Sequence, residues 1–174
     1  MKLDDDDFTL FDLPPRFALD RPTLDARWRA LQGEVHPDRF AADGAAAQRL
    51  AMQWAVRVNE AYQRLKDPLR RAAYLCELRG APVKAEDNTA MPANFLLQQM
   101  AWREALDDAG GLAAVEALEQ DLKRHERERL DALAAALDET GDSAAAVQQV
   151  RALMFVARFR QELERRLEAL ESQD

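Results

Sequence analysis

The sequence has little of the chemistry that metal sites and covalent catalysis use. Its 174 residues include one cysteine, Cys76, and two histidines, His36 and His125. A single cysteine excludes an internal disulfide, and a zinc site made of Cys and His needs three or four such ligands. The sequence also lacks the HExxH and paired ExxH spacings with which carboxylates would complete a metal site. We therefore expect no metal site and no cofactor.

Serine is equally scarce, which bears on nucleophilic catalysis. The two serines, Ser143 and Ser172, lie far from His36 in the sequence, whereas a nucleophile must lie within hydrogen-bond reach of its base. The only pair of adjacent glycines, Gly110-Gly111, is interpreted as a helix break and not as a phosphate loop. Cys76 lies among apolar residues of an amphipathic segment, as core cysteines do. We expect a protein that is not an enzyme; a helical hydrolase using His36 remains a third hypothesis.

Long apolar runs and an excess of positive charge are also absent. No run approaches the ~18–20 apolar residues that a membrane span needs, and the acidic first residues resemble neither a secretory signal nor a transit peptide. We therefore expect a cytoplasmic protein with no membrane contact. Residues 1–80 carry 13 basic and 13 acidic side chains, and residues 81–174 carry 11 and 19, which gives the whole net charge of −8. This acidity argues against nucleic acid as a partner, and the uneven charge favours two regions with different partners.

Most of the remaining sequence has helical periodicity, so we predict an all-α fold. A short apolar segment, FTLFDLP, ends at two prolines. Asp20 can cap the next helix, which has Pro22 in its first turn and ends before Pro37. A third helix is predicted from about residue 46 to residue 66, and a fourth over 69–80. The inward faces predicted for the second and third helices comprise Leu24, Trp28, Leu31 and Val35, and Leu50, Trp54, Val58, Ala61 and Leu65.

The second half of the chain begins after residues 81–92, which contain two prolines and no periodicity. We interpret this stretch as a linker. Three more helices are predicted, at about 93–109, 112–138 and 143–172. The last two are long and rich in Ala, Leu, Glu and Arg, which is typical of an antiparallel bundle. The C-terminal part is therefore predicted to be a three-helix bundle.

The stretch EVHPDRF, residues 34–40, places a histidine, a proline and an aspartate directly after a helical pattern. Alone, it is explained by a helix stop followed by an Asx-type turn. In its context, the order FTLFDLP, amphipathic helix, HPDRF, long helix with VNEAYQRLKDP, and LRRAAYLCELRG resembles the J domain of J-type co-chaperones over residues 8–80. These phrases, with TAMPANFLLQQMAWREALDD in the second half, resemble the HscB-type co-chaperones of iron–sulfur cluster assembly over essentially the whole chain. The resemblance implies a J domain at 1–80, a linker at 81–92 and a scaffold-binding bundle at 93–174.

The resemblance also implies which residues contact a chaperone. In J domains the His-Pro-Asp loop stimulates ATP hydrolysis by a DnaK-type chaperone, and the helix before it usually offers a basic face. Asp38 would offer a carboxylate to a partner arginine on a loop that Pro37 stiffens. Residues 33–35, Gly-Glu-Val, stand where basic residues and a tyrosine are common, which weakens the basic face. The implied contacts with an HscA/DnaK-type chaperone are His36, Pro37, Asp38, Arg27, Arg29 and Arg39.

The predicted helix 93–109 has two apolar faces. Phe95, Trp102 and Leu106 share one face, which can pack into the bundle. The second face is apolar with a carboxylate edge and either marks an interaction site or is buried against the first half of the chain. The resemblance implies that it binds an IscU-type scaffold, with Ala101 where an acidic residue would be expected. The implied scaffold contacts are Leu96, Leu97, Met100, Glu104 and Asp108, with Phe155 as a further contact or, alternatively, a core residue.

The resemblance therefore implies a co-chaperone that stimulates the ATPase of an HscA/DnaK-type chaperone. Its second half would deliver an IscU-type scaffold to that chaperone during iron–sulfur cluster assembly and transfer. The alternative is a J-domain adaptor that serves a different client through its acidic bundle.

Overall fold

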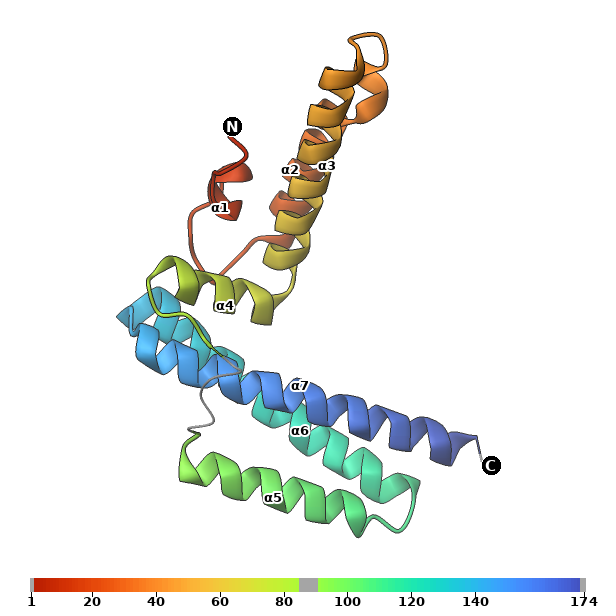
Figure 1. The fold of residues 1–174 in the computed structure, drawn as a ribbon. Coiled ribbons are helices and arrows are strands. Elements are labelled where there is room, and N and C mark those ends of the chain that lie inside the picture. The colour runs from red at the N-terminus through yellow and green to blue at the C-terminus, as the bar shows by residue number, and fades with distance from the viewer. Residues whose placement is uncertain (1, 85–90, 173–174) are drawn as a thin grey trace. The chain divides into compact units, whose positions relative to one another are not determined.

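The structure, a computed structural model, describes residues 2–84 and 91–172, and within them it contains helices and no β-strand. The predicted all-α fold is confirmed. The chain divides into two compact units, Met1–Leu75 and Cys76–Asp174, and the boundary between them falls inside the helix Pro68–Leu78. Residues 85–90 of the predicted linker lie outside the described residues. The helices, shown in Figure 1, are α1 Asp7–Leu10, α2 Arg21–Val35, α3 Ala45–Lys66, α4 Pro68–Leu78, α5 Ala93–Asp107, α6 Leu112–Ala134 and α7 Ser143–Glu171.

The first unit is built on a hairpin of α2 and α3. The Asp20 carboxylate accepts a hydrogen bond from the Thr23 backbone N–H (3.1 Å), which caps α2 as predicted. Between α2 and α3, the Trp28 ring stacks on the Tyr62 ring with centroids 4.3 Å apart. The Trp28 Nε1–H donates to Asn59 Oδ1 (3.0 Å). The buried seam comprises Leu24, Val35, Val58, Ala61 and Leu65, whereas Trp28, Leu31 and Trp54 are half-buried.

One residue of the predicted inward face is wrongly placed. Leu50 was expected in the core of the hairpin, but its side chain is 49% exposed. Leu50 lies where α2 ends at Val35 and the 3₁₀ turn Pro37–Phe40 begins, and there it lines an open pocket with Val35 and Phe40 instead of packing in the core. Periodicity identified the correct side of α3 but could not show that the packing at this end of the hairpin leaves a pocket open.

A buried carboxylate attaches α1 to the hairpin. The Asp7 side chain is fully buried, and its Oδ1 lies 2.8 Å from Arg57 Nη1. Its Oδ2 accepts a hydrogen bond from Arg64 Nη1 (2.9 Å), and its backbone N–H donates to the Tyr74 hydroxyl (3.0 Å). Phe8 beside it is also buried. The acidic first segment of the chain therefore includes residues that hold α1 against the hairpin.

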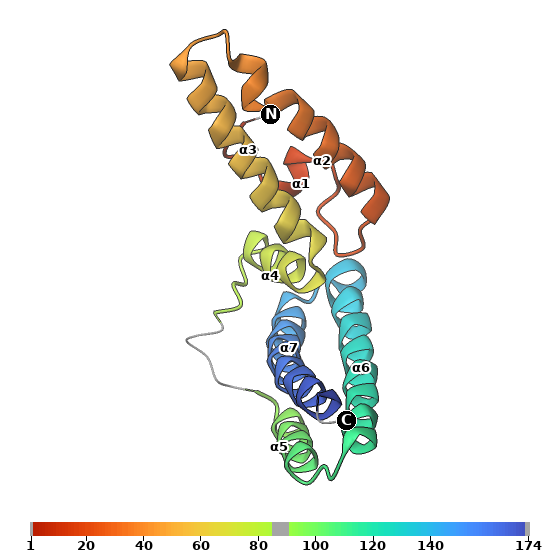
Figure 2. The same cartoon turned by 90° about the vertical axis from the view of Figure 1, so that its right-hand side faces the viewer.

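The second unit is a helical hairpin of α6 and α7 with α5 packed alongside (Figure 2). The predicted helix 112–138 is α-helical only to Ala134 and continues as a π-helical turn, Ala135–Thr140. Gly141, with a φ of 67°, ends it. No helix among the described residues is long and apolar enough to cross a membrane. The core of the bundle comprises Phe95, Trp102, Val115, Leu118, Leu122, Ala152, Val156, Phe159 and Leu163.

Candidate functional site

The first candidate site is the loop that follows α2. His36 has extended backbone angles (φ −61°, ψ 128°), as expected before a proline, and Pro37 begins the 3₁₀ turn. His36 Nδ1 accepts a hydrogen bond from the Asp38 backbone N–H (3.3 Å), so a neutral His36 carries its proton on Nε2. The Asp38 carboxylate is 90% exposed and the His36 ring is 59% exposed. The loop therefore presents an acidic side chain on a backbone that local hydrogen bonds hold in place.

Two of the three arginines predicted to contact a chaperone also hold this unit together. Arg39 Nη1 donates to the Gly33 carbonyl (3.0 Å), which satisfies one of the carbonyls left free at the end of α2. Arg27 Nη1 donates to the carbonyls of Phe11 and Asp12, and it lies 2.9 Å from the Asp12 carboxylate. Arg29 is exposed on the surface of α2. The basic face near the loop is therefore thinner than a count of arginines indicates.

A small apolar pocket lies beside the loop, and no sequence pattern predicted it. Its volume is about 300 Å³. The one signal in the sequence was the departure at residues 33–35, Gly-Glu-Val, which stand where the resemblance leads one to expect basic residues and a tyrosine. The pocket is lined by Glu34, Val35, Phe40, Ala47, Leu50, Ala51 and Trp54.

Two further observations concern metal binding and the single cysteine. Among the described residues, no group of three or more His, Cys, Asp or Glu side chains is placed to hold a metal ion. Cys76 is buried, and burial raises the pKa of its thiol, so the reactive thiolate is disfavoured. This arrangement agrees with the interpretation of Cys76 as a core residue.

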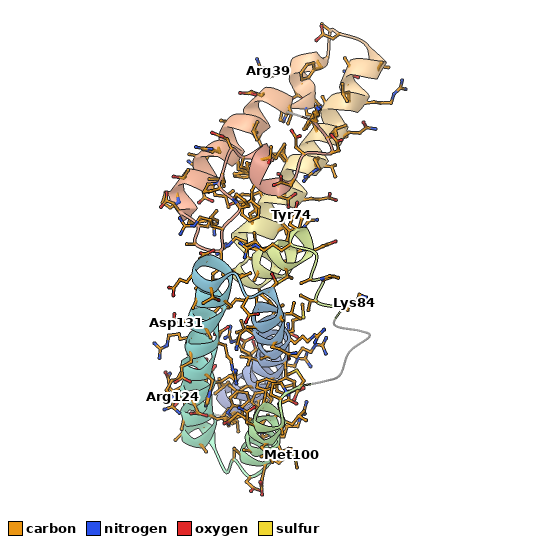
Figure 3. The ribbon with its side chains drawn as sticks, turned by 90° about the vertical axis from the view of Figure 1, so that its left-hand side faces the viewer. Arg39, Tyr74, Lys84, Met100, Arg124 and Asp131 are labelled. Atoms are coloured by element: carbon orange, nitrogen blue, oxygen red, sulfur yellow. The ribbon has the colours of Figure 1, made fainter. Side chains whose placement is uncertain are left out.

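The second candidate site is the outward face of α5. Leu96, Leu97 and Met100 are 44%, 67% and 67% exposed, whereas Phe95 and Trp102 on the opposite face are 2% exposed. Trp102 holds the buried face in place, because its ring stacks on Phe159 and its Nε1–H donates to Asp121 (3.0 Å). Figure 3 labels Met100 on this helix. Glu104 and Asp108 are also exposed and give the apolar face its carboxylate edge.

Phe155 on α7 packs between the core of the bundle and α5. Its ring meets Phe95 edge-on with centroids 5.8 Å apart and stacks on Phe159 at 6.4 Å. The side chain is half-buried. Phe155 therefore fills part of the core, as one of the two alternatives stated, and its role as a partner contact stays a prediction.

Comparisons with known proteins give the family. The curated co-chaperone protein HscB homolog of Burkholderia mallei is 55% identical over 174 residues, covering 98% of this chain and 99% of its own. The chain belongs to the HscB co-chaperone family. The homolog from Paraburkholderia xenovorans is 53% identical and covers 98% of both chains. The family model described as the HSCB C-terminal oligomerisation domain matches residues 91–164.

Solved structures of HscB proteins are similar over the same length. The chaperone HscB from Vibrio cholerae has a TM-score of 0.89 and 38% identity, covering 95% of this chain and 99% of its own. The human co-chaperone HscB also has a TM-score of 0.89, with 27% identity, 95% of this chain and 84% of its own covered. The resemblance inferred from the HPD loop and its context is confirmed. Because the relatives are named co-chaperones, the hydrolase hypothesis gains no support.

Proposed function

We propose that this HscB-family protein stimulates the ATPase of an HscA/DnaK-type chaperone and delivers an IscU-type scaffold to it during iron–sulfur cluster assembly and transfer. The observation that carries the proposal is that a chain related to co-chaperones over its whole length exposes two separate candidate binding surfaces. The first is the His36-Pro37-Asp38 loop and the second is the α5 face around Met100.

The loop would act by binding and not by chemistry. Pro37 and the Arg39–Gly33 hydrogen bond hold the backbone, so little conformational freedom is lost when Asp38 meets a partner. An exposed carboxylate can accept two parallel hydrogen bonds from a partner arginine. Such contacts shift the conformational equilibrium of the chaperone only if they are stronger in one of its conformational states than in the other. The chaperone, not this protein, then hydrolyses ATP.

The α5 face would bind the scaffold through apolar burial and charge. Leu96, Leu97 and Met100 offer side chains that lose water when covered, at about 25 cal/mol per Å² of apolar surface. Glu104 and Asp108 at the edge would favour a scaffold surface with basic residues, because complementary charge sets orientation and association rate.

The loop is tested by the steady-state ATP turnover of the chaperone. We expect Asp38→Ala to abolish stimulation while it leaves helicity and scaffold affinity unchanged, because the side chain is 90% exposed and supports little of the fold. Asp43→Ala, an exposed aspartate five residues further on, is the matched control and should stimulate normally. Normal stimulation by Asp38→Ala would show that the role given to the loop is wrong.

The α5 face is tested by calorimetric titration of the scaffold into the wild type and into Leu96→Ala/Met100→Ala. Both side chains are exposed, so the fold should survive. We expect about 100-fold weaker binding, if each truncation removes about 1.4 kcal/mol of apolar burial. Phe155→Ala is measured separately because that ring is half-buried and its loss would also reduce stability. If the wild type does not bind the scaffold, the alternative of a J-domain adaptor for a different client gains support.

A further inference from the structure

Arg103 shares a stripe of α5 with two residues of the candidate scaffold-binding face. Leu96, Met100 and Arg103 are four and three positions apart, and this spacing places side chains on one side of a helix. The three side chains are similarly accessible: Arg103 is 54% exposed, beside 44% for Leu96 and 67% for Met100. Arg103 is also the only basic residue in α5, whose other charged residues are Glu104 and Asp107.

Arg103 reaches from α5 to α7. Its guanidinium carbon lies 6.0 Å from the centroid of the Phe155 ring, and its Nη1 lies 3.3 Å from Glu162 Oε2. The guanidinium therefore joins the half-buried Phe155 to the exposed stripe of Leu96 and Met100. The ion pair with Glu162 is long, single and about half exposed on both sides, and such pairs contribute little to folding.

We propose that Arg103 determines the specificity of this surface by binding a carboxylate, an Asp or Glu side chain, on the scaffold. The inference rests on the proposed function of the α5 face. A partner that covers Leu96 and Met100 must also remove water from the guanidinium, and a charge without water needs a partner of opposite sign. Arginine has five N–H donors in a planar fork, of which Glu162 takes one. A scaffold carboxylate can take two others side by side.

This contact would fix the direction in which the scaffold lies along α5. An acidic scaffold residue is attracted by Arg103 and repelled by Glu104 and Asp108 at the carboxylate edge. Arg103 and that edge both lie at the C-terminal end of α5, and residues 93–102 carry no charged side chain. A scaffold turned end for end would place its acidic residue at the uncharged N-terminal end of α5, where it would lose water without gaining a basic partner.

Arg103→Ala and Glu162→Gln in the full-length chain separate partner binding from a merely structural role. We expect Arg103→Ala to weaken scaffold binding about tenfold, as loss of one charge-assisted contact does. We expect Glu162→Gln to leave the affinity unchanged or to raise it, because the guanidinium no longer has a competing carboxylate. If the ion pair merely fastened α5 to α7, both variants would weaken binding equally, and that outcome would overturn the inference.

Two further measurements complete the test. Arg127→Ala, which removes an exposed arginine from α6, should keep wild-type affinity and controls for net charge. The affinity of Arg103→Ala should depend less on salt concentration than that of the wild type, since one ionic contact is missing. An unchanged affinity of Arg103→Ala, with wild-type binding intact, would refute this inference alone. No binding of the scaffold by the wild type would overturn both this inference and the proposed function of the α5 face.

Discussion

Asp7 is expected to be a main contributor to the stability of the first unit. Its carboxylate is fully buried, with Arg57 at 2.8 Å and Arg64 at 2.9 Å. Breaking a fully buried ion pair costs about 3–5 kcal/mol because it leaves a buried charge unpaired. Here the two arginines are 20% and 39% exposed and can turn toward water. We therefore expect Asp7→Ala to lower the free energy of unfolding by about 2–3 kcal/mol.

The assay is urea unfolding followed by circular dichroism, with thermal unfolding as a second measure. For a unit of this size the loss corresponds to a decrease in melting temperature on the order of 10–15 °C. Asp7→Asn keeps the shape and one acceptor and should lose less. Asp4→Ala, an exposed aspartate of the same segment, is the control and should stay within about 0.5 kcal/mol of the wild type. If Asp7→Ala is as stable as that control, the cost of burying the carboxylate equals the gain from its two arginines, and Asp7 does not stabilise the first unit.

Two further predictions concern Asp25 and Arg151. The hydrogen bond from Arg21 lowers the pKa of the Asp25 carboxyl. The stability that the ionised Asp25 carboxylate contributes is present above the unfolded pKa, about 3.9, and is lost as pH falls through the lower folded pKa. Asp25→Asn should therefore flatten the fall in stability on the acid side, measured as urea midpoints between pH 5 and pH 2. Arg151 donates two hydrogen bonds to the Val83 carbonyl (3.1 and 2.8 Å), so Arg151→Ala should destabilise the second unit by about 1–2 kcal/mol. Arg151→Lys should not restore it, because lysine lacks the planar fork; full recovery in a thermal melt would contradict this.

The positions of the helices could be predicted because prolines and caps mark them in the sequence. The third helix was expected at about 46–66 and is Ala45–Lys66, since Pro68 follows closely and limits its end. The change to a π-helical turn after Ala134 had no such signal. There Arg79 Nη1 donates to the Leu137 carbonyl (2.7 Å), a contact between residues 58 positions apart. Local patterns contain no information on that pairing.

The exposed face of α5 was also predictable, because periodicity separates Phe95 and Trp102 from Leu96 and Met100. Arg103 was missed for a different reason. On the helix alone it is an ordinary solvated arginine, and its position matters only through Phe155 and Glu162 on α7. Periodicity shows which residues share a side of one helix, but it does not show which neighbouring helix that side meets.

The arginines near the HPD loop also show that a sequence pattern does not reveal which neighbouring groups a side chain contacts. The resemblance to J domains implied that Arg27 and Arg39 contact a chaperone, yet each donates to a backbone carbonyl of its own unit. Arg27 fixes the segment after α1, and Arg39 closes the end of α2. The contact of Arg39 keeps the loop rigid, and a mobile Asp38 would lose more conformational entropy on binding. Arginines that make such contacts within their own unit are only partly free to attract a partner, and this explains why a loop can have arginines nearby and still present a thin basic face.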